Sequence, residues 1–283
     1  MEEHVLQNPN MQKKSFAPKL FTNPVIRKLG KVQDRASEGE GATYKGIAMK
    51  CLYFVLLTVA GVVLSYVLPG ILGGEAIPLE ANGVTYSFTM AEIGIVIVAA
   101  IFTVITPMVA WLIRPAIPVV GSLYSIGQGY LIMWSVNKFL GDYKEIAFFA
   151  LVITLALVFT MAILYATRII KVNQKFKTVI TVLFAASIVS SIAIAVLYAI
   201  PATRAVAQVF TNNFAISIIS SVLGIIIATL FLLSDFDAVE KTVEHNLPKK
   251  YEWAAAYGLI FTVIWLYLKV LNLLLKVTQK SKD

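Results

Sequence analysis

Charged residues cluster along this chain and leave seven long intervals that contain no Lys, Arg, Asp or Glu. The intervals cover residues 51–74, 93–113, 115–137, 146–167, 178–203, 205–234 and 253–268. A hydrocarbon core about 30 Å thick requires about 20 apolar residues in a helix, at a rise of about 1.5 Å per residue. Six intervals reach that length, and the last one reaches it when it is extended past Lys269. The pattern therefore predicts seven transmembrane helices.

Neither the periodicity nor the composition fits a barrel or a soluble domain. A lipid-facing barrel strand alternates apolar and polar residues over about ten positions, and these intervals do not alternate. Hydrophobic residues make up 58% of the chain and charged residues 14%, against about a quarter charged in soluble domains. We expect an all-α polytopic membrane protein with a flexible basic tail over residues 1–50, a seven-helix transmembrane domain over 51–277 and a short tail over 278–283. The loops are too short to hold a second folded domain.

Basic residues are distributed unevenly between the two sides that seven helices create. Residues 1–50 carry nine Lys or Arg against five acids and have no apolar core of the kind a signal peptide needs. The predicted loops on the same side add Arg114, Arg168, Lys171, Lys175, Lys177, Lys241, Lys249 and Lys250. The loop over 69–92, on the other side, has no basic residue. This bias predicts a cytosolic N-terminus, and it relates the net charge of +8 to lipid headgroups rather than to nucleic acid.

Residue types that usually carry enzyme or metal chemistry are scarce. Cys51 is the only cysteine, which excludes an intrachain disulfide, and His4 and His245 are the only histidines. We find no nucleophile paired with a base, no spacing of metal ligands and no glycine-rich phosphate loop. We therefore expect a protein that is not an enzyme and that has no cofactor and no metal site.

A few polar residues stand in or beside the apolar intervals, where an ionisable or amide group needs a partner. They are Arg114, Gln128, Asp235, Asp237 and Lys269. Gln128, in SLYSIGQGYLIMW, either bridges helices or lines a polar pathway, and the small residues around it favour packing. Lys269 either faces the bundle interior or extends its ammonium toward the outer interface, beside Trp265 and Tyr267.

Asp235 and Asp237 follow the sixth apolar interval, in the stretch LLSDFDAVE. Because they are two positions apart, at most one of them can fully face the bundle interior. In one interpretation the helix ends at Leu233 and the cytosol solvates both aspartates, which composition alone favours. In the other interpretation Asp235 lies between helices and pairs with Arg114, which ends the second predicted helix on the same side.

Three stretches of the chain resemble the Bax inhibitor-1 family, in particular its bacterial branch. They are TNPVIRKLG from residue 22, IRPAIPVVGSLYSIGQGY from residue 113 and LLSDFDAVEKTVEHNLPKKYEWAAAYGLIFTVIWLYLKVLNLLL from residue 232. The resemblance covers most of the chain, and its strongest part is the Asp-Phe-Asp segment followed by Tyr251 and Trp253. It implies six helices around a central seventh, a location in the bacterial inner (plasma) membrane and, for some relatives, a pH-sensitive calcium leak.

The resemblance also implies roles for individual residues. In those relatives an aspartate on the sixth helix shares a proton with one on the seventh, so Asp235, or else Asp237, would be half of a cytoplasmic gate. The second acid is missing here, because one alignment places it near Phe261 and another at Lys269. Gln128 likewise stands where many relatives have a glutamate. A single interior carboxylate is a poor calcium site, since calcium prefers about six to eight oxygen ligands.

Two functions follow as hypotheses. The first is a pH-sensitive cation leak, for calcium or protons, with Asp235, Asp237 and Arg114 at its cytoplasmic gate and Gln128 and Lys269 as secondary polar groups. The second is a regulatory membrane protein without transport that binds or restrains a membrane protease or another membrane partner, as some bacterial relatives do. The lipid bilayer is a partner in both hypotheses, and nucleic acid is a partner in neither.

Overall fold

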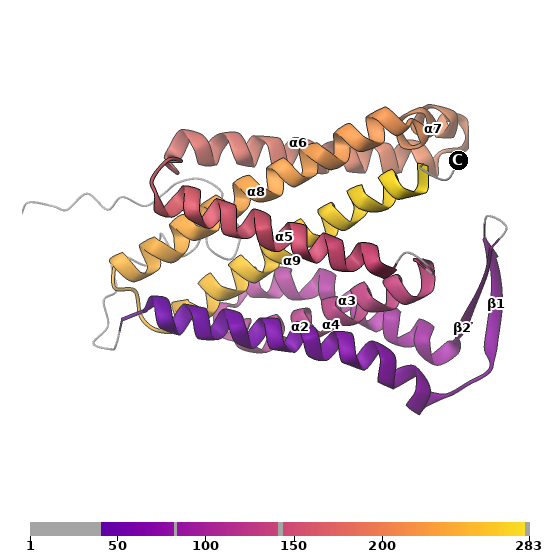
Figure 1. Cartoon of the computed structure of the whole chain (residues 1–283), viewed down its shortest axis with the longest axis horizontal. Helices are drawn as coiled ribbons and strands as arrows, with labels where there is room; N and C mark the ends of the chain where they lie inside the picture. Colours follow the sequence, from indigo (N-terminus) through magenta and orange to yellow (C-terminus); the bar gives the residue numbers. More distant parts are fainter. Residues whose placement is uncertain (1–40, 82–83, 141–143, 281–283) are drawn as a thin grey trace, which may run out of the picture.

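The computed structural model describes residues 41–81, 84–140 and 144–280, and most of them are helical (Figure 1). The long helices are α2 (Tyr44–Leu72), α3 (Met90–Leu112), α4 (Ile117–Phe139), α5 (Lys144–Ala166), α6 (Gln174–Ala199), α8 (Phe214–Glu244) and α9 (Tyr251–Lys280). Shorter elements are the helix α7 (Arg204–Asn212), the 3-10 turns η2 (Arg114–Ala116) and η4 (Pro201–Thr203), and the strands β1 (Ala76–Ala81) and β2 (Val84–Thr89). Within the described residues, seven helices are long and apolar enough to cross a membrane. This confirms the predicted all-α polytopic architecture.

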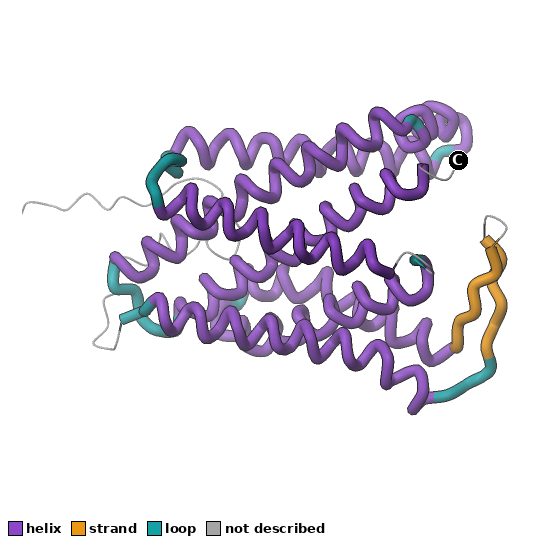
Figure 2. Tube along the Cα trace, in the orientation of Figure 1, coloured by secondary structure: helices purple, strands orange, loops and turns teal. Residues whose placement is uncertain are grey.

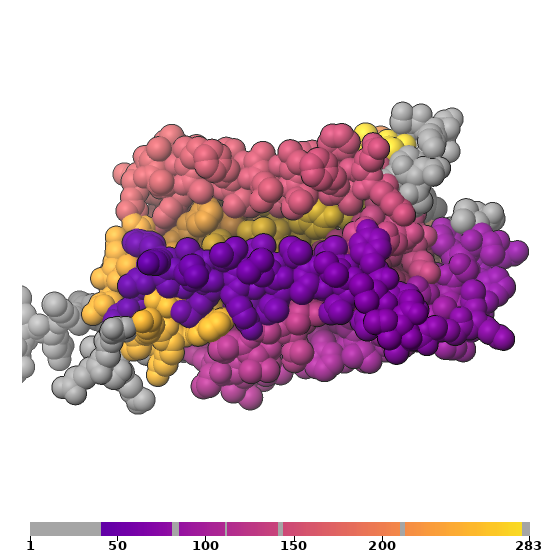
Figure 3. All heavy atoms as spheres, turned by 60° about the horizontal axis from the view of Figure 1, so that its bottom comes forward, coloured from indigo at the N-terminus to yellow at the C-terminus, as the bar shows by residue number. Residues whose placement is uncertain are grey.

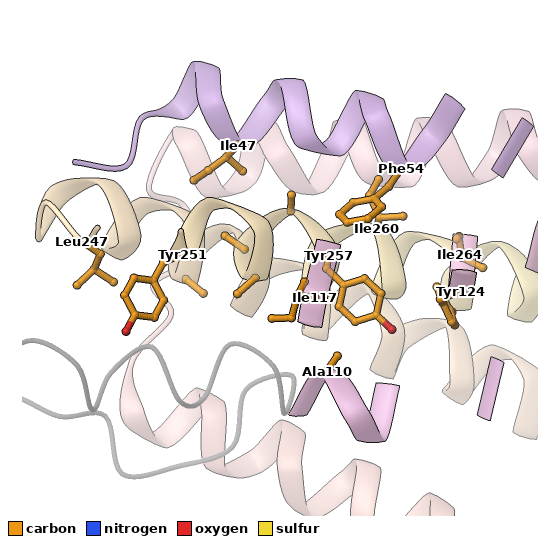
Figure 4. Close-up of a cluster of buried hydrophobic side chains, with 14 residues drawn as sticks. Ile47, Phe54, Ala110, Ile117, Tyr124, Leu247, Tyr251, Tyr257, Ile260 and Ile264 are labelled. Atoms are coloured by element: carbon orange, nitrogen blue, oxygen red, sulfur yellow. The ribbon is translucent and has the colours of Figure 1, made fainter. Parts of the chain in front are cut away.

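The last helix, α9, occupies the centre of the bundle, as the resemblance implies. It contacts α2, α4, α5 and α8, and in Figure 3 its yellow atoms are visible in the seam between indigo α2 and the rose-coloured helices. One buried cluster packs α9 against α2 and α4, with Tyr257 between Phe54 and Tyr124 at ring-centroid distances of 5.9 and 5.6 Å (Figure 4). A second cluster packs the later turns of α9 against α5 and α8. Both halves of the core therefore depend on α9.

Two glycines allow α2 and α4 to approach at backbone distance. A Cβ atom added at Gly129 would lie 2.0 Å from the Thr58 carbonyl oxygen, and one added at Gly61 would lie 2.1 Å from the Ile126 carbonyl oxygen. Small residues permit this kind of contact between membrane helices, where packing replaces the hydrophobic driving force. The close contact supports the packing interpretation of the small residues around Gln128.

Capping side chains set several helix starts, and two of them correct predicted boundaries. The Thr43 side chain accepts a hydrogen bond from a backbone N–H of the first turn of α2, so this helix begins inside the predicted tail. Asn213 caps α8 in the same way and separates it from α7. The predicted interval 205–234 is therefore two helices. The rest of the predicted tail, residues 1–40, lies outside the described residues.

An antiparallel hairpin of β1 and β2 follows α2 at the end of the bundle that also carries α7 (Figure 2). Thr89 and Glu92 form a reciprocal capping box that joins β2 to α3. The Lys138 ammonium, from α4, donates to the Ser87 carbonyl oxygen at 2.9 Å and pairs with Glu92 at 2.9 Å. The hairpin was not predicted from the sequence, and these contacts fix it to the ends of α3 and α4.

Candidate functional site

The starts of α2, α4, α6 and α9 and the ends of α3, α5 and α8 lie together at one end of the bundle, which we call the basic end (Figure 1). Its described basic residues are Lys45, Lys50, Arg114, Arg168, Lys171, Lys175, Lys177, Lys241, Lys249 and Lys250. Its described acidic residues are Asp235, Asp237, Glu240, Glu244 and Glu252. The basic end therefore carries the positive charge that the topology prediction assigned to the cytosolic side.

Asp235 lies inside the bundle and not at the end of a helix. Because α8 continues past Leu233 to Glu244, Asp235 is about 13 Å from the helix end at a rise of about 1.5 Å per residue. Its side chain is 0% exposed, and no Lys or Arg forms an ion pair with it in the described structure. The Thr262 hydroxyl of α9 lies in position to hydrogen-bond this carboxyl, and the Lys177 ammonium of α6 acts on it electrostatically. The interpretation in which α8 ends at Leu233 and the cytosol solvates the aspartates is therefore wrong.

Two lysines hold the second aspartate, Asp237. Its Oδ2 atom pairs with Lys177 Nζ from α6 and, at 2.7 Å, with Lys241 Nζ one turn later on α8. Lys177 is only 3% exposed. Removing one partner of a buried ion pair is costly, because the charge that remains is still desolvated and now unpaired. Asp237 thus ties α8 to the start of α6.

Arg114 does not reach either aspartate. The carbon of its guanidinium group lies 5.7 Å from the ring centroid of Tyr251, at the start of α9. Arg114 forms no ion pair within residues 41–81, 84–140 and 144–280. The predicted pair of Arg114 with Asp235 is wrong, because the longer α8 places Asp235 deeper in the bundle than a residue that follows the end of α3.

Another carboxylate, Glu240, joins α8 to the loop between α5 and α6. It accepts a hydrogen bond from the Tyr165 hydroxyl and pairs with the Arg168 guanidinium. The hydrogen bond to Glu240 raises the pKa of Arg168 above its usual value, so this guanidinium stays charged. Sequence reasoning missed this cluster, since its members are 72 and 75 positions from Glu240 and no local pattern relates them.

A fourth carboxylate, Glu252, is completely buried in the first turn of α9. It pairs with Lys50 of α2 and accepts hydrogen bonds from the Thr43 backbone N–H at 2.9 Å and the Thr43 hydroxyl at 3.3 Å. We call this arrangement the Glu252 clamp, because it joins the start of α2 to the start of α9. It was also missed from the sequence, where Glu252 comes shortly after Lys249 and Lys250 and resembles an ordinary loop charge.

The two secondary polar residues lie apart from this end of the bundle. Gln128 is half-buried on α4, one turn after Tyr124, whose hydroxyl it contacts. Lys269 is half-buried on α9: its ammonium lies 6.0 Å from the Trp265 ring centroid, and its side chain packs against Gly224 of α8. Neither residue contacts the aspartates, so the structure does not join them to the candidate gate.

The carboxylates Asp235, Asp237, Glu240 and Glu252 each face basic or hydroxyl side chains. In the part of the chain that the structure describes, no three His, Cys, Asp or Glu residues are placed to hold a metal ion. Asp237 faces lysines, and the group beside Asp235 on α9 is the Thr262 hydroxyl. Such a carboxyl can hold or release a proton, and its need for water or a cation changes with that proton.

These features define a class of protein: a seven-helix membrane protein whose sixth spanning helix buries an aspartate against a central seventh. The chain matches the family model described as Bax inhibitor 1 like over residues 23–279, and it therefore belongs to this family. Comparison with curated proteins and with solved structures finds no match. The TNPVIRKLG stretch, at the start of the matched region, lies outside the described residues.

Proposed function

We propose that the protein is a pH-sensitive cation leak with Asp235 at its cytoplasmic gate, and that calcium is the first ion to test. One observation carries the proposal: Asp235 is fully buried beside α9, and no Lys or Arg of the described structure forms an ion pair with it. An ionisable residue in a transmembrane bundle is costly and commonly marks an ion or proton pathway. Membership of the family, in which some relatives leak calcium, supports the same function.

The protonation state of Asp235 gives a physical basis for gating. A neutral carboxylic acid tolerates the dry contact between α8 and α9, whereas a carboxylate needs water or a cation there. Ionisation therefore favours a wetter and more open contact. The charged groups around it are Lys177 of α6 with Asp237 and Lys241 of α8, and they keep that end of α8 attached to α6.

The first test is ion flux through the purified protein in liposomes, measured for calcium and for protons from mildly acidic to mildly alkaline pH. Asp235→Asn imitates the neutral acid, so we expect its flux to stay at the acidic limit of the native protein at every pH. Glu244→Gln is the matched control, since Glu244 is exposed on the same helix and its change should leave the pH profile intact. A pH profile that Asp235→Asn does not alter would contradict the role of Asp235.

Asp237→Asn separates gating from structural support. It leaves Lys177 and Lys241 without their shared anion, so we expect a less stable protein whose flux retains its dependence on pH. Thermal unfolding in detergent and flux should be measured on the same preparations. A stable Asp237→Asn protein that has lost its pH dependence would place the gate at Asp237 instead of Asp235.

The alternative proposal is a regulatory membrane protein without transport, which binds or restrains a membrane protease or another membrane partner. The absence of a carboxylate at both Phe261 and Lys269, where the family pattern has a second acid, favours this alternative. It predicts no flux for either ion at any pH. Deleting residues 1–40 should then remove the effect on the partner, whereas a leak should survive this deletion.

A further inference from the structure

A pocket of about 650 Å³ opens at the basic end, apart from the buried aspartates. It lies between the start of α4, with the turn η2 before it, and the start of α9. The side chains that matter for its chemistry are Lys50, Arg114, Lys249, Lys250, Tyr251 and Trp253. A volume of this size is typical of pockets that bind small organic molecules, which span roughly 300–1,000 Å³.

The charge of the pocket favours an anion. All four of its charged lining residues are basic, and one of them, Lys50, is compensated by Glu252. The Arg114 guanidinium carbon and the Lys250 ammonium each lie 5.7 Å from the Tyr251 ring centroid. Neither of these two residues forms an ion pair in the described structure. The first turns of α4 and α9 also line the pocket, and helix N-termini carry partial positive charge.

The apolar part of the pocket and its position indicate which anion fits. Tyr251, Trp253, Pro115 and Pro118 form much of its lining, so a bare phosphate ion would leave these groups uncovered. The pocket lies at the ends of spanning helices, the level at which lipid headgroups meet basic and aromatic side chains. We propose that this pocket binds the phosphate headgroup of an anionic membrane phospholipid, with the phosphate at Arg114 and Lys250 and the glycerol region against the rings.

The test is lipid binding by the full-length protein in phosphatidylcholine nanodiscs, with phosphatidylglycerol titrated into the bilayer. Native mass spectrometry of the released protein counts the retained phosphatidylglycerol. The double variant Arg114→Gln with Lys250→Gln should bind it roughly tenfold more weakly, because two charge-assisted contacts are lost. The matched control, Lys171→Gln with Lys175→Gln, removes the same charge from exposed positions at the same end and should bind as the native protein does.

One more variant distinguishes lipid binding in this pocket from general electrostatic attraction and from misfolding. The charge-conserving variant Arg114→Lys with Lys250→Arg should retain most of the binding. The proposal is overturned if both charge-removing pairs weaken binding equally, if the pocket pair has no effect, or if soluble glycerol phosphate displaces the lipid at equal concentration. This readout is independent of ion flux, so failure of the leak proposal leaves it unchanged.

Discussion

Asp235 and Glu252 are both completely buried carboxylates at the same end of one bundle, yet their surroundings differ. Glu252 pairs with Lys50 and accepts two hydrogen bonds from Thr43, whereas Asp235 has no ion-pair partner among the described residues and has the Thr262 hydroxyl beside it. A fully satisfied charge stabilises one arrangement of its neighbours, and an unsatisfied one is a common sign of a functional position. At the scale of residues, Glu252 is therefore structural, and Asp235 is the candidate for function.

Removing the charge of Glu252 should destabilise the protein. Glu252→Gln leaves the Lys50 ammonium without its carboxylate, and we expect a loss of about 1–3 kcal/mol in the free energy of unfolding. Thermal unfolding in detergent measures the effect. Glu145→Gln, an exposed carboxylate in the first turn of α5, is the control and should unfold like the native protein.

The double variant Lys50→Met with Glu252→Gln tests whether this loss comes from the pair. It removes both charges, so it should recover part of the stability that Glu252→Gln loses. Equal melting temperatures for Glu252→Gln and the native protein would show that the clamp contributes nothing measurable.

At the scale of elements, the contact between α2 and α4 depends on the absence of side chains at two positions. The added Cβ atom of an alanine at Gly129 would meet the Thr58 carbonyl oxygen at 2.0 Å, and backbone atoms cannot turn aside as a flexible side chain can. The two helices would have to separate, and the aromatic cluster of Phe54, Tyr124 and Tyr257 spans the same interface.

Gly129→Ala should therefore lower the free energy of unfolding by about 1–3 kcal/mol, the usual cost of overpacking. Gly94→Ala is the matched control, because it adds the same methyl group to the spanning helix α3, where no atom lies within 4 Å. Thermal unfolding of the two variants in one detergent compares them directly. If both variants unfold at the same temperature, the close contact between α2 and α4 is not a source of stability.

Spanning helices could be predicted from the sequence, whereas contacts between distant segments could not. Spanning helices and the central position of α9 were predicted, since length and hydropathy are properties of single segments and the family pattern supplied the arrangement. One of the two interpretations of Asp235 and Asp237 ended α8 too early, at Leu233, because the two aspartates resemble a boundary until neighbouring helices are known to cover them. The ion pairs of Glu240 and Glu252 join distant segments, and no local pattern relates such partners.

One missed element did have a local signal. The sequence EAIPLEANGVTYSFT contains an Asn-Gly dipeptide followed by alternating apolar and polar residues, which is a strong hairpin signal. The break between α7 and α8 likewise follows from Asn213, a common capping residue within an uncharged interval.

At the scale of the whole molecule, the two ends of the bundle differ in charge, and this difference predicts its orientation. We expect the basic end to face the cytosol and the hairpin to face the opposite side. In a Cys51→Ala background, Glu80→Cys on β1 should react in intact cells with a thiol reagent that cannot cross membranes. Lys171→Cys, in the loop between α5 and α6, should react only after permeabilisation, and the reverse pattern would contradict the orientation.

The central position of α9 has a consequence for biosynthesis. The six spanning helices that surround it precede it in the chain, so a ribosome delivers the wall of the bundle to the membrane before its centre. Until α9 is inserted, Phe54, Tyr124 and Leu232 lack the side chains that bury them in the finished protein. The nascent protein therefore completes its fold only after its last helix enters the bilayer, and a chain interrupted before α9 is an expected substrate for membrane quality control.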